Sequence, residues 1–398
     1  MLYHAFQNEK LSALGFGAMR LPLGANGEID QAELDRMVDA AMAAGVNYFD
    51  TAYAYHGGKS ETALGASLRR YPREQWNLAD KFPGHQNVKG VKPLVPEEVF
   101  EDQLKKCGVD YFDFYLLHNV CESSLTYYYG EKIDECLSYF LEQKARGRIR
   151  HMGFSSHATA ETLERFLDKY GAQFEFCQIQ LNFVDWKLQN AKKKVELLRA
   201  HGIPVWVMEP VRGGKLAKFG EGIEAKMRAM RPEETTPAWA FRWLSTVPKP
   251  TMILSGMSNL AQMQDNLKTF SEEKPLNSDE LQLLDEAAAS LARMIPCTAC
   301  RYCCAGCPMG LDIPTLLSIA NDMAVAGSFN VVSRYTILGD GKRADACIGC
   351  GQCEMVCPQK IHVPEEMRKL AALMETQKTW EEICAERAAI AEAAKRGK

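Results

Sequence analysis

Apolar residues follow two different patterns along the first two thirds of this chain. Short apolar runs, typical of buried β-strands, alternate with longer stretches in which apolar residues recur every three to four positions, as on one face of a helix. Strands and helices are therefore expected to alternate regularly. The short runs predict eight strands, at residues 14–19, 47–50, 77–81, 113–118, 149–155, 176–182, 203–209 and 251–256.

Two of the periodic stretches also show where their helices begin and end. Residues 31–45 carry apolar residues at helical spacing and close on a glycine, a common helix stop. Residues 96–108 place glutamates in the first turn and lysines in the last, which matches the charge preference of the helix dipole. Both stretches predict helices between the strands.

Regular alternation of strands and helices predicts a parallel sheet, and eight such units fit a closed α/β barrel, the (β/α)8 TIM barrel, at residues 1–275. A doubly wound open sheet is the competing architecture. That sheet would carry a Gly-x-Gly-x-x-Gly sequence after its first strand, and none follows here. The barrel is therefore the predicted fold.

The pattern changes near residue 276. Residues 276–294 predict a helix, and further helices are predicted at 313–327 and 379–398, the last of them rich in strong helix formers. Residues 276–398 are therefore expected to form a second, smaller and mainly helical domain.

Composition places the chain among folded globular proteins. Of the 398 residues, 46% are hydrophobic and 25% are charged, and the net charge is only −4. No run of five or more basic residues occurs, so neither nucleic acid nor an anionic membrane surface is an expected partner. The start of the chain shows no basic segment leading into an apolar stretch, and no apolar run is long enough to span a membrane, so a cytoplasmic location is expected.

The 14 cysteines are distributed unevenly. Nine lie between residues 297 and 357, and the other five are scattered at no recurring interval. A disulfide framework is typical of short secreted domains, so dense cysteines at one end of a long chain are better explained as metal ligands.

Eight of these nine cysteines form the spacing pattern C-x2-C-x2-C-x3-C-P, which occurs twice. In this pattern three thiolates bind one [4Fe–4S] cluster, and the more distant fourth cysteine binds the other cluster. The expected ligands of the first cluster are Cys297, Cys300, Cys303 and Cys357. The expected ligands of the second cluster are Cys347, Cys350, Cys353 and Cys307.

Zinc is the main alternative to iron–sulfur clusters. Four ligands in two C-x2-C pairs would satisfy zinc and leave the additional cysteines of each run unexplained, so two [4Fe–4S] clusters are predicted. Cys304, the fifth cysteine of the first run, is interpreted as a small buried residue beside a cluster, with a spare ligand as the alternative. The module resembles the dicluster ferredoxins, and its helical spacer is more similar to their α-helical type than to the compact β-type.

Four polar residues lie where predicted barrel strands end. Asp50 ends the second strand, Lys81 the third and His118 the fourth, and Tyr55 lies in the loop after the second strand. Barrel enzymes gather their catalytic groups at these carboxyl-terminal strand ends. In their sequence contexts "DTAYAY", "DKF" and "LLH", the four residues resemble the catalytic tetrad of the aldo-keto reductase family, and the resemblance covers about residues 1–275.

The chemistry of carbonyl reduction explains why these residue types would act together. Hydride delivered to a carbonyl carbon leaves an alkoxide that needs a proton, which Tyr55 can give. A free phenol is a weak acid at neutral pH, so the Lys81 ammonium is expected to lower the pKa of Tyr55 while Asp50 holds the lysine. His118 is expected to hydrogen-bond the carbonyl oxygen. Tyr53 is the alternative acid, but Tyr55 has the family's spacing from Asp50.

The resemblance also implies a nicotinamide cofactor, NADP or NAD. It implies that Ser155 and Gln178 contact the carboxamide. The loop after the seventh strand is expected to pass over the pyrophosphate with Pro210, Val211, Gly213 and Lys215. The segment after the eighth strand is expected to bind the adenosine side with Gly256, Ser258, Gln262 and Asn266. No Lys or Arg occurs at residues 251–267, where many relatives hold the 2′-phosphate of NADP, so both nucleotides stay open.

Two positions depart from the family pattern. Ser156 stands where the family often has Asn, and His56 stands where relatives commonly have Gly. Because His56 is next to the proposed acid, it is interpreted either as a residue of the substrate pocket or as a half-exposed loop histidine.

The leading hypothesis is an NAD(P)H-linked oxidoreductase that interconverts a small-molecule carbonyl and an alcohol and carries two [4Fe–4S] clusters. The clusters would pass electrons to a substrate, exchange them with a redox partner protein, or stabilise the domain. The alternative is a ferredoxin-type electron carrier or redox sensor whose barrel only binds a nicotinamide. The complete tetrad argues against this alternative, since a sensor does not need Tyr55 beside Lys81.

Overall fold

The computed structural model describes residues 1–87, 91–291, 295, 297, 301–357 and 359–396 of the chain. Two compact units are present, one made of residues 1–284 with the end of the chain from Arg387, and one made of residues 285–386. Each unit has its own hydrophobic core. The domain boundary expected after residue 275 stays a prediction, because the helix α11 (Ser278–Leu291) continues across the division between the units.

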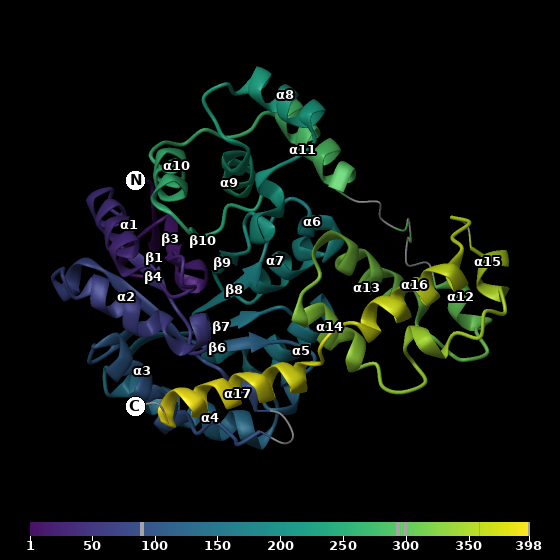
Figure 1. Cartoon of the computed structure of the whole chain (residues 1–398), viewed down its shortest axis with the longest axis horizontal. Coiled ribbons are helices and arrows are strands. Elements are labelled where there is room, and N and C mark those ends of the chain that lie inside the picture. The colour runs from purple at the N-terminus through teal and green to yellow at the C-terminus, as the bar shows by residue number, and fades with distance from the viewer. Residues whose placement is uncertain (88–90, 292–294, 296, 298–300, 358, 397–398) are drawn as a thin grey trace. The chain divides into compact units, whose positions relative to one another are not determined.

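Eight parallel strands close the barrel of the first unit (Figure 1). The strands follow one another around the barrel in sequence order, and the last pairs with the first. All eight predicted strands are present, and no predicted end lies more than two residues from the observed one. The strands are β3 (Leu14–Gly17), β4 (Tyr48–Asp50), β5 (Asn77–Phe82), β6 (Phe112–Val120), β7 (Ile149–Ser156), β8 (Phe176–Gln180), β9 (Val205–Met208) and β10 (Met252–Gly256).

Helices lie around the barrel strands (Figure 1), and both helices predicted in detail are confirmed. Asp30 begins the first of them by accepting a hydrogen bond from Glu33 N, and Gly108 ends the other with a φ of +66°. These are common helix ends, because an N-cap carboxylate satisfies a free N–H and glycine tolerates the left-handed conformation. The helices of this unit are α1 (Gln31–Ala43), α2 (Ser60–Leu68), α3 (Pro96–Cys107), α4 (Glu131–Ala145), α5 (Ala160–Tyr170), α6 (Asp185–Leu188), α7 (Ala191–Ala200), α8 (Glu221–Met230), α9 (Thr236–Thr246) and α10 (Leu260–Thr269).

A two-stranded antiparallel hairpin, β1 (Tyr3–Phe6) and β2 (Glu9–Ser12), precedes the barrel and is absent from the sequence-based prediction. Each strand has four residues, too few to show a clear apolar alternation. The Phe6 ring is buried against Trp206, with 4.9 Å between the ring centroids. The hairpin therefore adds Phe6 to the core cluster formed by the barrel strands.

Large side chains fill the interior of the barrel. Tyr48, Phe114, Phe176 and Trp206 are fully buried members of one cluster, and the rings of Phe176 and Trp206 lie 4.7 Å apart. Tilted and edge-on ring contacts of this kind add to the stabilisation from burial. Because the interior is packed, the polar chemistry of the barrel is confined to its strand ends and loops.

The second unit repeats one arrangement of elements. The short helix α12 (Tyr302–Ala305) and the longer α13 (Ile313–Ala326) recur 50 residues later as α15 (Gln352–Met355) and α16 (Val363–Glu375). A residue with positive φ precedes each short helix, Arg301 at +65° and Gly351 at +74°. The internal repeat therefore extends beyond the cysteine motif, which is the repeat that the sequence analysis identifies.

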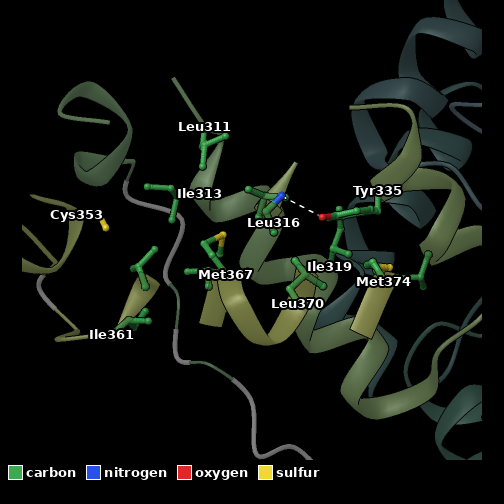
Figure 2. Packing of buried hydrophobic residues seen from close by; sticks show 14 of the residues in the cluster. Leu311, Ile313, Leu316, Ile319, Tyr335, Cys353, Ile361, Met367, Leu370 and Met374 are labelled. Atoms are coloured by element: carbon green, nitrogen blue, oxygen red, sulfur yellow. Dashed lines mark hydrogen bonds between the residues drawn. The ribbon is translucent and has the colours of Figure 1, made fainter. Parts of the chain in front are cut away.

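Helices α13 and α16 pack against each other and against α14 (Phe329–Thr336) around one apolar core, shown in Figure 2. Leu316 of α13 and Met367 of α16 are both fully buried there. The hydroxyl of Tyr335 on α14 accepts a hydrogen bond from Ala344 N at 3.1 Å. Leu311 and Ile361, which occupy equivalent places in the two repeats, belong to the same core.

All three helices expected in the carboxyl-terminal region are present. They are α11, α13 and α17 (Trp380–Arg396). Within the described parts of the chain, none of the helices combines the length and the apolar character that crossing a lipid bilayer requires.

Candidate active site

Strand register brings the four tetrad candidates to one end of the barrel. Asp50 is the last residue of β4 and pairs with Ala79 of β5, two residues before Lys81. Lys81 in turn pairs with Leu116 of β6, two residues before His118. Tyr55 follows β4 and begins a short 3-10 turn at residues 55–58. The carboxyl-terminal ends of three neighbouring strands therefore hold all four residues.

Lys81 and Asp50 form a buried ion pair. Lys81 Nζ donates to Asp50 Oδ1 at 2.6 Å and to the Thr51 carbonyl oxygen at 2.5 Å, and the lysine side chain is fully buried. Burial disfavours the ammonium, but Asp50 and Tyr55 together with Asp80 outweigh it and raise the pKa of Lys81. Burial also raises the pKa of Asp50, and the Lys81 ammonium opposes that rise.

Tyr55 lies over this ion pair. Its ring centroid is 5.1 Å from Lys81 Nζ and 5.9 Å from the ring of His118. Burial raises the pKa of Tyr55, and the Lys81 ammonium opposes that rise without overcoming it. The lysine therefore acts in the expected direction, but the expected net lowering of the pKa is not observed.

Tyr53, the alternative acid, lies in a different environment. Its ring faces Lys106 of α3, with Nζ 4.3 Å from the ring centroid. It therefore contacts a lysine outside the tetrad, and the geometry favours Tyr55 over Tyr53.

His118 is neutral in this environment. Burial holds the pKa of His118 well below its usual range, with His85 and Lys81 adding to the effect. Its Nδ1 is buried and has no hydrogen-bond partner among the described residues. A neutral imidazole retains one N–H, so this side chain can donate to a carbonyl oxygen.

Sequence reasoning missed His85. Its buried ring lies 4.7 Å from the ring of His118, at nearly right angles to it. Burial lowers the pKa of His85 to about 3, so the site contains two neutral imidazoles. The only signal in the sequence is that His85 follows shortly after the predicted strand that ends at Lys81.

His56 has a structural contact. Its Nε2 accepts a hydrogen bond from Leu21 N at 3.0 Å, and its φ of +51° lies in the region that favours glycine. The side chain therefore ties the loop after β4 to the segment after β3.

The residues expected near a nicotinamide carboxamide lie side by side. Ser155 of β7 and Gln178 of β8 are register partners, and both are buried. Ser155 Oγ accepts a hydrogen bond from Asn119 N at 2.8 Å. Gln178 Oε1 is buried and makes no hydrogen bond within the described chain. A buried acceptor without a donor costs about 1–3 kcal/mol, so this oxygen fits an amide N–H from a bound group.

The loop after β9 contains two glycines with positive φ, as expected of a backbone that approaches a pyrophosphate closely. Gly213 and Gly214 have φ of +64° and +92°, conformations that a residue with a Cβ rarely adopts. The buried Arg212 holds the loop in place by donating from Nε to Asp185 at 3.1 Å. Of the four expected contacts, Gly213 and Lys215 are exposed, Val211 is half-buried and Pro210 is buried.

Three of the four candidates after β10 form hydrogen bonds within the chain. Gln262 Oε1 accepts from Ser258 N at 2.8 Å, and Asn266 is buried and donates from Nδ2 to Ser255 Oγ at 2.9 Å. Ser258 Oγ donates to the Arg20 carbonyl oxygen at 3.0 Å. Gly256 and Ser258 remain exposed and accessible.

In the second unit, four cysteines line one hollow. They are Cys307, Cys347, Cys350 and Cys353, the set expected for the second cluster. Apolar residues complete the wall, including Leu311, Ile313 and Met367. Four thiols in an apolar wall fit an iron–sulfur cluster, whose ligands are cysteine thiolates. As the side chains stand, no three described Cys, His, Asp or Glu residues converge closely enough to hold a single metal ion.

The set expected for the first cluster is described only in part. Cys297, Cys303 and Cys357 pack against the apolar core of the second unit. Cys300 lies outside the described residues. Cys304 is half-buried beside Cys303.

Comparison with known proteins gives the family. The model of the aldo/keto reductase family matches residues 13–289, and that of a 4Fe-4S dicluster domain matches residues 296–362. The chain belongs to the aldo/keto reductase family. It is therefore an oxidoreductase with a barrel of that family, followed by a helical region that matches a 4Fe-4S dicluster domain.

Relatives of known name match most of the barrel. The NADH-specific methylglyoxal reductase of Escherichia coli is 26% identical over 326 residues, which is 71% of this chain and 96% of that protein. The L-galactose dehydrogenase of Arabidopsis thaliana is 23% identical over 303 residues, 71% of this chain and 91% of that protein.

Solved structures share the fold. An aldo-keto reductase from Bacillus halodurans in its holo form matches with a TM-score of 0.57 and 24% identity, over 72% of this chain and 96% of that one. An aldo/keto reductase from Klebsiella pneumoniae in complex with NADP and acetate matches with a TM-score of 0.56 and 19% identity, over 71% of this chain and 94% of that one.

Proposed function

We propose that the barrel interconverts a small-molecule carbonyl and an alcohol with NADH or NADPH, and that Tyr55 is the general acid and base. The arrangement of Tyr55 over the buried Lys81–Asp50 pair, with His118 beside it, carries this proposal. A phenol, a fixed ammonium and a neutral imidazole around one point are the groups that protonation of an alkoxide requires.

The residues that would hold the nicotinamide lie at or just after the ends of four strands, β7, β8, β9 and β10. Ser155 and Gln178 would bind the carboxamide, the glycine-rich loop around Gly213 would cover the pyrophosphate, and Gly256 and Ser258 would meet the adenosine side. The unpartnered Gln178 Oε1 and the exposed glycines support this assignment. When bound, the reduced nicotinamide supplies a hydride to the carbonyl carbon.

The protein's own residues handle the proton. His118, neutral because of burial, donates its N–H to the substrate oxygen and orients the carbonyl. Burial raises the pKa of Tyr55, so the phenol is protonated at neutral pH and gives its proton to the developing alkoxide. Lys81 then stabilises the phenolate, and Asp50 keeps the lysine charged and in place. In the reverse direction the phenolate takes the proton of the alcohol.

We also propose two [4Fe–4S] clusters in the second unit. The first would be held by Cys297, Cys300, Cys303 and Cys357, and the second by Cys347, Cys350, Cys353 and Cys307. The shared hollow of the second set and the repeated arrangement of helices support the pairing. Such clusters supply one-electron transfer. None of the 13 described cysteines forms a disulfide, so the sulfurs of the proposed ligands among them are available to the clusters.

Replacing Tyr55 by Phe tests the proposed acid. In anaerobically purified protein, Tyr55→Phe should lower the kcat for carbonyl reduction by about 10²–10⁴-fold, because it removes the transferable proton. The dissociation constants of the nucleotides should stay within about threefold, since the ring remains. Methylglyoxal is the first substrate to try, because a relative is named for it, and it should be tested with NADH and NADPH separately.

Tyr53→Phe is the matched control, since Tyr53 faces Lys106 instead of Lys81. It should turn over like the unmodified protein. Unchanged turnover by Tyr55→Phe, or an equal loss in both variants, would contradict the assignment of Tyr55.

A further inference from the structure

The amino end of α10 is bonded to a carboxylate from another helix. Leu260 N, at the first position of α10, donates to Glu33 Oε1 at 2.9 Å. Glu33 lies in the first turn of α1, more than 200 residues earlier, and its side chain is only 18% exposed. The two helices are neighbours because β10 pairs with β3 when the barrel closes.

Other N–H groups at this helix end also have partners from the chain itself. Asn259 Oδ1 accepts from Gln262 N at 2.9 Å, and Gln262 Oε1 accepts from Ser258 N at 2.8 Å. A helix amino end attracts anions because its N–H groups lack partners within the helix. Here the N–H groups of Ser258, Leu260 and Gln262 have partners, and the partner of Leu260 N is a carboxylate.

Two neighbouring groups favour the ionised form of Glu33. The hydrogen bond from Leu260 N lowers the pKa of Glu33, and Arg36 lowers it further. Arg36 Nε donates to Glu33 Oε2 at 3.0 Å, while Glu33 Oε1 accepts from Leu260 N, so the carboxylate bridges the guanidinium and the helix end. The segment from Thr251 to Leu267 contains neither Lys nor Arg.

We propose that Glu33 makes this barrel select NADH over NADPH. The inference rests on the proposed function, which places the adenosine side of the nucleotide at Gly256 and Ser258, just before α10. NADPH carries a dianionic 2′-phosphate where NADH carries a hydroxyl. The phosphate would meet a carboxylate and find three backbone donors of this helix end taken, whereas a ribose hydroxyl can donate a hydrogen bond to a carboxylate. Glu33 is thus a specificity-determining residue.

The test measures binding of each nucleotide to the anaerobically purified full chain by calorimetry. The unmodified protein should bind NADH at least about tenfold more tightly than NADPH, a difference of about 1.4 kcal/mol. Glu33→Gln keeps a side chain that can accept from Leu260 N and removes the charge. It should tighten NADPH binding by about tenfold and change NADH binding by less than about threefold.

Two further variants separate the possible causes. Glu33→Gln also releases Arg36, so Glu33→Gln/Arg36→Ala shows whether the gain comes from lost repulsion or from a freed cation. The double variant should retain at least half of the gain in NADPH affinity that Glu33→Gln shows, when the gain is expressed as the logarithm of the ratio of dissociation constants. Glu142→Gln, on the exposed face of α4, removes a carboxylate elsewhere on the barrel and should leave the preference unchanged.

Each result decides between distinct statements. A preference of the unmodified protein for NADPH overturns the inference without any variant. Equal weakening of both nucleotides by Glu33→Gln also overturns it, because Glu33 then only supports the helix end. Failure of the unmodified protein to bind either nucleotide contradicts the proposed function itself.

Discussion

Replacing Asp50 by Asn should destabilise the barrel, because it leaves the Lys81 ammonium buried without its counter-charge. Lys81 is fully buried, and its Nζ donates to Asp50 Oδ1 at 2.6 Å and to the Thr51 carbonyl at 2.5 Å. Asparagine keeps the shape of the side chain, and the bond to Thr51 is retained. The substitution therefore isolates the effect of one charge.

The magnitude follows from the burial of the pair. Removing one partner of a buried ion pair costs about 3–5 kcal/mol. The retained hydrogen bond to the Thr51 carbonyl places the expected loss near the lower end, at about 3 kcal/mol. That is a large share of the roughly 5–15 kcal/mol that stabilises a typical domain. Asp102→Asn is the control: it breaks an exposed pair with Lys106 in which Asp102 is 43% exposed, and it should cost less than about 1 kcal/mol.

Urea unfolding of the anaerobically purified full chain, followed by tryptophan fluorescence, measures these losses. The double variant Asp50→Asn/Lys81→Met removes both charges and should be more stable than Asp50→Asn alone. Lys81→Met alone also breaks the buried pair, at about 3 kcal/mol or more, so the two substitutions should be non-additive by at least about 3 kcal/mol. Both variants should lose carbonyl reduction, since one lacks the carboxylate that pairs with Lys81 and the other lacks Lys81 as well.

Two results would refute this reasoning. One is a loss of unfolding free energy for Asp50→Asn that is no greater than the loss for Asp102→Asn. It would mean that burial does not make the Asp50–Lys81 pair more important for stability than an exposed pair. The other is strict additivity of Asp50→Asn and Lys81→Met, which would mean that the two side chains do not interact.

Two further predictions concern the barrel's other end and the cysteines. Burial alone would lower the pKa of His151, but hydrogen bonds to Glu175 and Glu9 outweigh it and raise the pKa to about 9. The stabilisation from the imidazolium is thus complete below pH 6.5 and is lost as the pH rises to 9, so the free energy of unfolding should fall over that window. An equal fall in a His151→Gln variant would show that His151 is not the cause. The purified protein should contain about eight irons per chain, and Cys353→Ser should lower that number, whereas Cys304→Ser should not. Stoichiometric zinc in place of iron, or equal iron loss in both variants, would overturn the ligand assignment.

Local patterns in the sequence were sufficient for the order of elements. The eight strand positions follow from short apolar runs, because a strand buried in a closed barrel is apolar along its own length. Asp50, Lys81 and His118 were identifiable for the same reason, since each ends such a run. The cysteine spacing likewise predicts iron–sulfur clusters without any knowledge of the fold.

Contacts between distant residues could not be read in this way. The hairpin with Phe6 has strands of four residues, and its place against Trp206 follows only from the closed barrel. The net pKa of Tyr55 was predicted in the wrong direction, because the sequence shows the neighbouring lysine but not the burial that outweighs it. The extended repeat of the second unit was not predicted, since outside the cysteines its sequence signal is short, an apolar residue and an apolar-Pro pair at 311–314 and again at 361–364.

Glu33 and His85 show most clearly why some site residues could not be predicted from the sequence. Nothing in the local sequence of either residue marks it, since a glutamate in a first helical turn and a histidine in a loop are both common. Their partners, Leu260 and His118, lie far away along the chain and come near only when the barrel closes. Periodicity and motif spacing describe short stretches of chain, whereas the preference of a site for one ligand depends on charges that tertiary structure brings together.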